Sequence, residues 1–163
     1  LRKHIAEARL CRIMLNTPVF IRQGVAGYCC EDPIYDELME KLFGCMGMAI
    51  KLEDGDPFEA FTVASSSGTA FIFELMTYWQ DWIEEHGIDP DLARQIAVHT
   101  FLGSAKLAEQ SEDKLVDLQA RVTSKKGVTA VGLESMRSLE IEGLLRLSFN
   151  KAAQRYRELG QKS

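Results

Sequence analysis

The sequence predicts a mainly α fold, in which a long helical region follows the last strands and one helix of an α/β domain. Two observations support this prediction. Up to about residue 54, short apolar runs of strand type alternate with a helical pattern, which is the signature of α/β proteins. From Asp56 onward, helix start signals recur and no convincing strand separates them. We therefore expect two parts, residues 1–54 and residues 55–163.

The first part contains three predicted strands and one predicted helix. The strands are expected at Cys11 to Leu15, Val25 to Cys30 and Met46 to Leu52, and the helix from about Pro33 to Phe43. Residues Leu1 to Arg9 resemble the end of a helix, and the chain has no initiator methionine. Because three strands make a poor sheet on their own, we expect this part to be cut from a larger α/β domain with further strands upstream.

The second part consists of predicted helices, which are expected near residues 56–64, 68–86, 90–110, 112–121, 128–139 and 141–159. The second of these is apolar almost all the way round, whereas a surface helix has one apolar stripe. Such a helix needs cover on several sides, and a second copy of the chain is the expected cover. The alternative is the central helix of a compact bundle.

Composition narrows the class of protein. The net charge is −5, and the basic residues are spread along the predicted helices, so we expect no nucleic-acid surface. No apolar run is long enough to cross a bilayer, and the start of the chain predicts no signal peptide. Composition therefore indicates a soluble globular protein, and the cysteines described next favour a cytoplasmic location.

The four cysteines lie in the first third of the chain, at Cys11, Cys29, Cys30 and Cys45. They form no C-x-x-C pair and have no suitably spaced histidines, so we expect no metal site. The simplest interpretation is that all four are buried thiols of a protein kept in a reducing compartment.

The run from Ser124 to Thr129 predicts a helix entrance that binds a small anion. Ser124 is expected to cap a helix that starts near Val128, and Gly127 is expected to permit the sharp turn before it. The free N–H groups of such a start attract a carboxylate or phosphate. Lys125 and Lys126 fit an anion site, because cations at this end of a helix are otherwise unfavourable. The alternative is an ordinary capped helix with two solvated lysines.

Two further segments resemble helix starts. In the run Ser65-Ser66-Ser67-Gly68, Ser66 or Ser67 is expected to cap the following helix. Glu112 with Asp113 is expected to form a capping cluster at the start of the helix 112–121.

Four short motifs occur in a specific order: M-L-N-T-P at residues 14–18, S-S-S-G-T-A-F at 65–71, L-G-S-A-K at 102–106 and V-T-S-K-K-G-V-T at 122–129. They resemble M-x-N-T-P, S-G-S-G-P-A-Y, L-G-A-A-K and V-[TS]-S-P-G-G-[TA]-T of the pyrroline-5-carboxylate reductases. Each motif is modest by itself, but four in order are specific. Over nearly its whole length, the chain resembles the C-terminal half of that family.

The resemblance implies a reductase that passes hydride from NADPH or NADH to the C=N bond of a cyclic imine, which produces proline. In the family, an N-terminal Rossmann domain holds the dinucleotide, and an all-helical C-terminal domain interlocks with its twin as a homodimer. Residues 1–54 would then be the remnant of the dinucleotide-binding domain, and residues 55–163 the helical dimerisation and substrate-binding domain. The sequence leaves assembly beyond a dimer open.

The resemblance also implies roles for individual residues. Thr129 would help to hold the substrate carboxylate, with the backbone of Ser124, Gly127 and Val128 around it. Glu112 matches a family glutamate near the nicotinamide and the substrate.

The turn Asn16, Thr17 and Pro18 matches the family turn that borders the nicotinamide. The chain itself has no G-x-G-x-x-G or G-x-G-x-x-A after a strand, so most of the cofactor contacts would lie in an N-terminal domain outside it. We expect the 163 residues alone to be inactive.

Two departures from the family pattern leave the substrate open. Lys125 and Lys126 replace the proline and first glycine of the substrate loop, and Thr69 and Phe71 replace a proline and a tyrosine. A divergent member that reduces another anionic imine, or a non-catalytic dimerising module, are therefore the alternatives.

Overall fold

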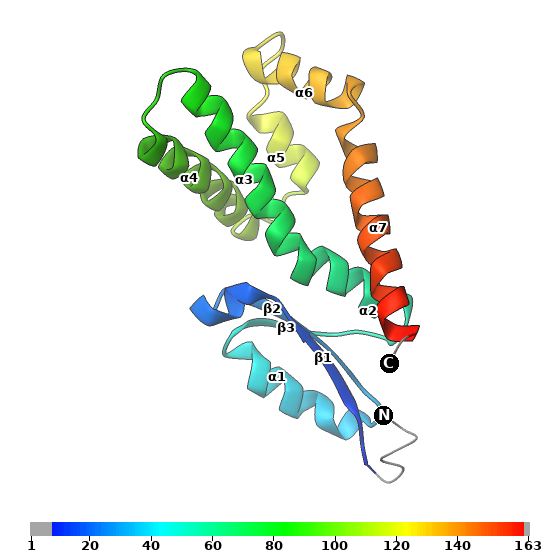
Figure 1. The fold of residues 1–163 in the computed structure, drawn as a ribbon. Helices are drawn as coiled ribbons and strands as arrows, with labels where there is room; N and C mark the ends of the chain where they lie inside the picture. The colour runs from blue at the N-terminus through cyan, green and yellow to red at the C-terminus, as the bar shows by residue number, and fades with distance from the viewer. Residues whose placement is uncertain (1–7, 162–163) are drawn as a thin grey trace. The chain divides into compact units, whose positions relative to one another are not determined.

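The computed structural model describes residues 8–161, coloured along the chain in Figure 1. Most of the predicted helix end at Leu1 to Arg9 therefore lies outside the described residues. The chain forms two compact units. One contains the described residues up to Phe71 together with those from Phe149 onward, and the other is Ile72–Ser148. The division falls within α3 (Gly68–Glu85) and within α7 (Ile141–Gln161).

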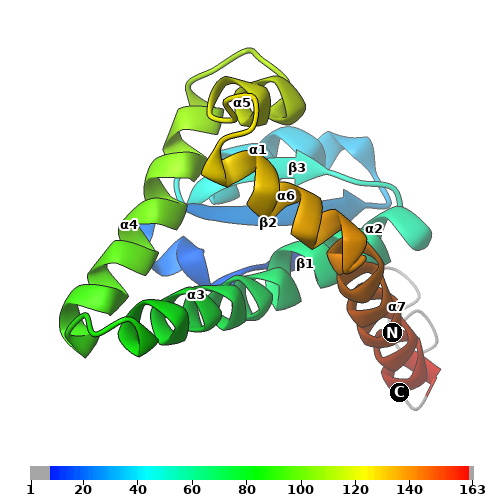
Figure 2. The same cartoon turned by 90° about the horizontal axis from the view of Figure 1, so that it is seen from above.

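The first unit is built on a three-stranded sheet in the order β1-β2-β3. Strands β1 (Cys11–Leu15) and β2 (Gly24–Cys30) are antiparallel, and β3 (Gly47–Lys51) is parallel to β2. A parallel neighbour requires a crossover, and here the crossover contains α1 (Asp36–Gly44), which covers one face of the sheet (Figures 1 and 2). All three strand predictions are confirmed to within a residue or so.

The predicted helix 33–43 starts as a short 3-10 helix, Pro33–Tyr35, before α1 begins. Asp32 caps it, because its Oδ1 atom accepts a hydrogen bond from the Ile34 N–H at 3.1 Å.

The core of this unit is built around two large side chains, Tyr28 of β2 and Phe58 of α2 (Asp56–Phe61), both fully buried. The Tyr28 hydroxyl donates to Glu40 Oε1 of α1 at 3.1 Å. Burial, the bond to Glu40 and the negative charge of that carboxylate raise the pKa of Tyr28 to about 12. The guanidinium of Arg12 lies 4.4 Å from the centre of the Phe58 ring, so a cation–π contact joins β1 to α2.

A π-helical turn, Thr62–Ser67, connects α2 directly to α3. The predicted capped entrance at Ser66 or Ser67 is therefore wrong, because the helix does not restart there. The nearby hydroxyls bond to backbone carbonyls: Thr62 Oγ1 donates to Phe58 O at 2.8 Å and Thr69 Oγ1 to Ser65 O at 3.2 Å. Hydroxyls that bond to carbonyl oxygens of the preceding turn do not cap a helix start, and such bonds are compatible with the wider π-helical turn.

The second unit is all-helical and follows the predicted order. After α3 come α4 (Pro90–Glu109), α5 (Leu115–Arg121), α6 (Val128–Ser138) and the first part of α7. Asp89 caps α4 by accepting from the N–H groups of Asp91 and Leu92 at 3.0 and 3.3 Å. Helix α5 starts three residues later than predicted, and its N-cap is Lys114 without a side-chain cap bond. The capping role predicted for Glu112 and Asp113 is therefore wrong.

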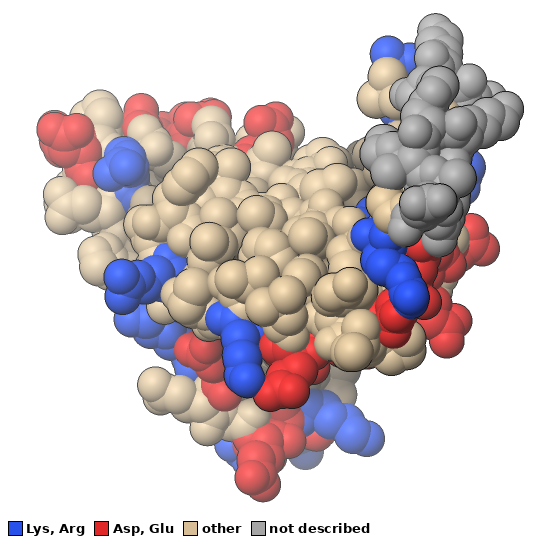
Figure 3. Space-filling model, turned by 90° about the horizontal axis from the view of Figure 1, so that it is seen from below, with Lys and Arg blue, Asp and Glu red and all other residues tan. Residues whose placement is uncertain are grey.

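Little of the apolar surface in the second unit is covered. Among its described apolar residues, only Ile83, Ala93 and Ala97 are buried. On α3, Trp82 is 62% exposed and Phe73 61% exposed, as expected for a helix that is apolar on several sides. Figure 3 views the chain from the side on which Figure 1 draws the sheet and α1, and it shows a broad area without Lys, Arg, Asp or Glu on the first unit as well.

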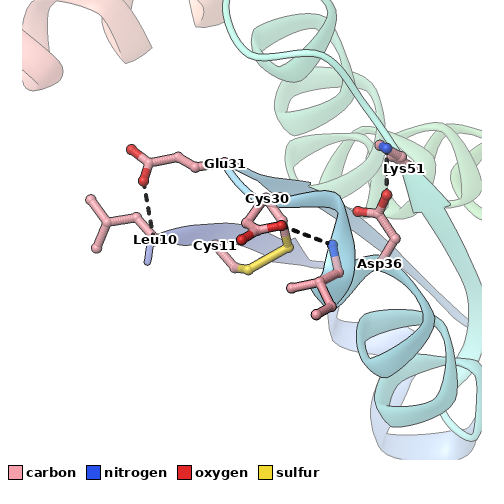
Figure 4. Close-up of a disulfide and its surroundings, with 8 residues drawn as sticks. Leu10, Cys11, Cys30, Glu31, Asp36 and Lys51 are labelled. Atoms are coloured by element: carbon pink, nitrogen blue, oxygen red, sulfur yellow. Dashed lines mark hydrogen bonds and ion pairs between the residues drawn. A yellow bond between two sulfur atoms is a disulfide. The ribbon is translucent and has the colours of Figure 1, made fainter. Parts of the chain in front are cut away.

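The expectation of four buried free thiols is wrong. Cys11 and Cys30 form a disulfide, which Figure 4 shows in close-up, and the two free cysteines are the half-buried Cys29 and the exposed Cys45. Cys11 and Cys30 are direct partners in the antiparallel register of β1 and β2, so their side chains meet on one face of the sheet. Cysteine usage therefore no longer indicates a reducing compartment.

Gly47 is expected to be indispensable to the sheet. Its φ is +137°, and a Cβ atom there would lie 2.1 Å from the carbonyl oxygen of Gly24 on the neighbouring strand. We predict that Gly47→Ala lowers the free energy of unfolding by about 2 kcal/mol or more, measured by urea denaturation. Gly44→Ala is the matched control, because nothing lies within 4 Å of its Cβ position, and it should not destabilise. Equal effects of the two substitutions would contradict the assignment.

The raised pKa of Tyr28 predicts a loss of stability at high pH. The unfolded tyrosine ionises near pH 10, whereas the folded one ionises near pH 12. The stabilisation is therefore complete below pH 10 and is lost as the pH rises from about 10 to about 12. Unfolding midpoints measured across this range should fall more steeply for the unaltered chain than for Tyr28→Phe. Parallel curves for the two proteins would refute this prediction.

Candidate functional site

The segment predicted as an anion entrance lies at the start of α6, and its backbone differs from the prediction in two ways. The N-cap of α6 is Gly127, and no side chain caps it, so the capping role predicted for Ser124 is wrong. Instead, the Ser124 carbonyl oxygen accepts the Gly127 N–H at 3.0 Å and closes a turn. The residue with the left-handed backbone in this turn is Lys126, at φ 59°, whereas Gly127 has φ −80°.

Glycine at position 127 leaves room for a close approach of Ser124. A Cβ atom there would lie 2.1 Å from Ser124 Oγ and 3.2 Å from the Ser124 carbonyl oxygen. Gly127 therefore allows the Ser124 side chain to approach the backbone, and the sharp turn is supplied by Lys126.

The first turn of α6 presents unpaired backbone donors. The Val131 N–H reaches back to Gly127 O at 3.3 Å, so the preceding N–H groups of Val128 and Thr129 have no acceptor within the helix. Thr129 is exposed, and Val128 is 93% exposed. Lys125 and Lys126 are exposed beside this helix start. Backbone donors, a hydroxyl and two ammonium groups are an arrangement that can hold a carboxylate.

Glu112 lies in the loop between α4 and α5 and is exposed. Its neighbours are fastened: Ser111 Oγ donates to Asp113 Oδ2 at 2.9 Å, and Arg121 pairs with the same carboxylate at 2.6 Å. Among the described residues, no hydrogen bond or ion pair joins Glu112 to the start of α6.

In the first unit, the turn at Asn16, Thr17 and Pro18 follows β1 directly and opens a 3-10 helix, Thr17–Ile21. Asn16 fastens this turn to β2, because its Oδ1 atom accepts the Val25 N–H at 2.8 Å and its own N–H donates to Val25 O at 3.3 Å. Thr17 remains exposed. The Asn16 side chain is thus engaged in positioning the turn.

The serine run meets this turn, which sequence reasoning did not foresee. Ser66 Oγ donates to the carbonyl oxygen of Leu15 at 2.9 Å, one residue before Asn16. The neighbouring Ser65 Oγ is buried without a hydrogen-bond partner among the described residues. Both segments had been singled out as motifs, but no spacing in the sequence indicated that they touch.

The predicted residues thus fall into two groups. Asn16, Thr17 and Pro18 belong to the first unit, whereas Glu112 and residues 124–129 belong to the second. A cleft of about 690 Å³ in the second unit is lined by Gln119, Met136, Arg137 and Glu140, among others, and includes none of the predicted residues.

Two further findings concern the part of the chain that the structure describes. No group of three or more His, Cys, Asp or Glu side chains there is gathered as a metal ion would require. No helix in that part is both long and apolar enough to span a membrane.

Comparison with known proteins gives a consistent result. Residues 56–159 match the family model for pyrroline-5-carboxylate reductase dimerisation. The chain is 33% identical to the pyrroline-5-carboxylate reductase of Pseudomonas aeruginosa over 92% of its own length and 56% of the relative. It is 32% identical to that of Pisum sativum, over 98% of the chain and 59% of the relative. The chain thus spans little more than half the length of these curated relatives.

Solved structures share the fold. The pyrroline-5-carboxylate reductase of Coxiella burnetii superimposes with a TM-score of 0.91 at 29% identity, over 97% of this chain and 60% of that one. A Plasmodium falciparum pyrroline carboxylate reductase solved with NADP bound gives 0.86 at 21% identity, over 95% and 63%. The matched motifs, the helical second unit and these comparisons agree: the chain belongs to the pyrroline-5-carboxylate reductase dimerisation family.

Proposed function

We propose that this chain is the C-terminal part of a nicotinamide-dependent reductase that converts pyrroline-5-carboxylate to proline. The observation that carries the proposal is the exposed start of α6, which holds the N–H groups of Val128 and Thr129 without an acceptor in the helix, and the Thr129 side chain. This start lies in the stretch that matches the family model. A carboxylated cyclic imine is the substrate class that such an entrance can hold.

The structure of residues 8–54 supports the proposal that residues 1–54 belong to a dinucleotide-binding domain. They contain a sheet with only three strands and the crossover helix α1. Exposed apolar side chains on this unit include Phe20, at 87%, and Ile34, at 75%. The chain spans about 56% of its Pseudomonas relative. We infer that residues 1–54 end a Rossmann-type domain and that residues 55–163 form the helical domain.

In this proposal, the described residues bind the substrate and orient it toward the cofactor. The backbone of Val128 and Thr129 holds the substrate carboxylate, and the Thr129 hydroxyl adds a third donor. The turn at Asn16, fastened to β2 at Val25, borders the nicotinamide, and Glu112 lies near the substrate. When bound, NADPH or NADH supplies the hydride for the C=N bond. Holding the two rings face to face is the main contribution of the protein.

A second substrate class is favoured by a specific observation. The entrance carries two exposed lysines, and Lys126 stands at φ 59° at the turn itself. Two extra cations suit an imine with more negative charge than pyrroline-5-carboxylate. A reductase for another anionic imine is therefore the second candidate, and a dimerising module without catalysis is the third.

The deciding experiment uses the complete protein that we propose, with its nucleotide-binding half. Oxidation of NADPH and NADH is followed by absorbance after adding pyrroline-5-carboxylate, and separately after adding pyrroline without the carboxylate. Turnover of the acid alone supports the proposal. Cofactor binding without turnover of the acid supports the second candidate, and the absence of both supports the third.

Replacing the entrance hydroxyl should weaken substrate use. We predict that Thr129→Val lowers kcat/KM for the imine about tenfold or more, because the substrate carboxylate loses one of its hydrogen-bond donors. Thr100→Val in α4 is the matched control, because the Thr100 hydroxyl donates to the carbonyl oxygen of Ile96 within its own helix, at 2.8 Å. Wild-type kinetics in Thr129→Val would remove Thr129 from the site.

We also propose that the helical part forms a homodimer. The apolar face of α3, with Trp79 and Trp82 42% and 62% exposed, lies within the residues that match the dimerisation family. We predict that Trp82→Glu shifts the chain from dimer to monomer in sedimentation equilibrium, because a charge would be buried without a partner. Ile21→Glu is the control, since Ile21 is 73% exposed but lies outside the matched residues. A dimer that survives Trp82→Glu would argue against this face.

A further inference from the structure

We propose that Cys11 and Cys30 are a reversible thiol–disulfide modification site, which small-molecule disulfides oxidise, and that its state sets the order of strand β1. The site belongs to the first unit and does not depend on the proposed reductase activity. Nothing in the four family motifs includes either cysteine.

The position of the pair makes the disulfide effective. Cys11 begins β1, Cys30 ends β2, and the two face each other across the antiparallel register (Figure 4). The bond closes a ring over a sequence separation of 19, and this ring contains the whole hairpin with the turn at Asn16, Thr17 and Pro18. Closing such a ring removes much of the freedom of the open hairpin.

Other contacts between described residues also join the two strands at this end of the hairpin. The Glu31 N–H donates to Leu10 O at 3.0 Å, and the Leu10 N–H donates to the Glu31 side chain at 3.3 Å. Arg9 and Asp32 form an ion pair, in which the Arg9 side chain is 62% exposed. Surface pairs of this kind contribute little. Within the described residues, β1 pairs with β2 alone, and the disulfide adds a covalent link to that pairing.

The other end of β1 is fastened independently. Asn16 bonds to Val25, and Ser66 Oγ donates to Leu15 O. Reduction should therefore loosen β1 from its Cys11 end and leave the turn attached to β2. Both cysteines of the pair are half-buried rather than enclosed, which leaves the sulfur atoms within reach of small thiols and disulfides.

The reaction with glutathione disulfide balances as two exchanges. One cysteine thiolate attacks a glutathione sulfur, forms a mixed disulfide and releases one glutathione thiolate. The second cysteine then attacks the protein sulfur of that mixed disulfide and releases the second glutathione. The pair is oxidised by two electrons and two protons leave, while glutathione disulfide is reduced to two thiols. Excess dithiol reverses both steps.

The test isolates the pair. The variant Cys29→Ser with Cys45→Ser keeps only Cys11 and Cys30, and Cys11→Ser with Cys30→Ser keeps only the other two cysteines. Both are reduced, treated with glutathione disulfide and analysed by thiol titration and intact mass. Hydrogen exchange of the β1 and β2 amides is then compared between the oxidised and reduced forms.

In the first variant, we expect both thiols to disappear without added glutathione mass and to return after reduction. Amides of β1 should exchange about tenfold or more faster in the reduced form, while those near Val25 change less. The second variant should show no internal disulfide. A stable glutathione adduct, an unreactive pair, or β1 exchange that is equal in both forms would each overturn the proposal.

Discussion

The helical half of this chain carries more large apolar side chains than it can cover by itself, and its arrangement depends on that imbalance. Only Ile83, Ala93 and Ala97 are buried among its described apolar residues, while Trp82 and Phe73 stay more than 60% exposed. Burying one such side chain is worth about 1.5–3 kcal/mol. A second copy on the α3 face would therefore supply much of the stability of this half. The start of α6 lies in the same unit.

The first unit differs from the second, because it buries large side chains in a core of its own. Tyr28 and Phe58 are fully buried between strands and helices, and Arg12 extends this core outward. Its guanidinium lies over Phe58 and hydrogen-bonds to the Tyr156 hydroxyl of α7. One residue of β1 thus contacts both α2 and α7. The strand that leads into the turn at Asn16 is held by this contact, by Ser66 and by the disulfide.

The sequence predicted the course of the backbone well, because apolar periodicity and start signals such as Asp89-Pro90 act locally. Side-chain roles were harder to predict. Ser66 looked like a cap but bonds to Leu15, which lies 51 positions earlier in the chain. Cys11 and Cys30 are paired by strand register, which composition does not reveal. The contact between the serine run and the strand before Asn16 likewise depends on tertiary structure. The sequence therefore identified the segments of the candidate site but not how they lie relative to one another.

The turn before α6 shows why local rules fail at such a site. A left-handed backbone costs a residue other than glycine roughly 1–2 kcal/mol, yet this turn assigns it to Lys126 while Gly127 takes φ −80°. The glycine instead leaves room for Ser124 Oγ, which lies 2.1 Å from the position that a Cβ atom would take. Lys125 and Lys126 also stand at the positive end of the α6 dipole, which disfavours cations. The left-handed lysine and the two cations both lower the stability of this helix start, so stability alone does not explain these residues. In the function that we propose, a bound anion would offset the second of these costs, because its charge would be opposite to that of the lysines and it would accept from the free N–H groups.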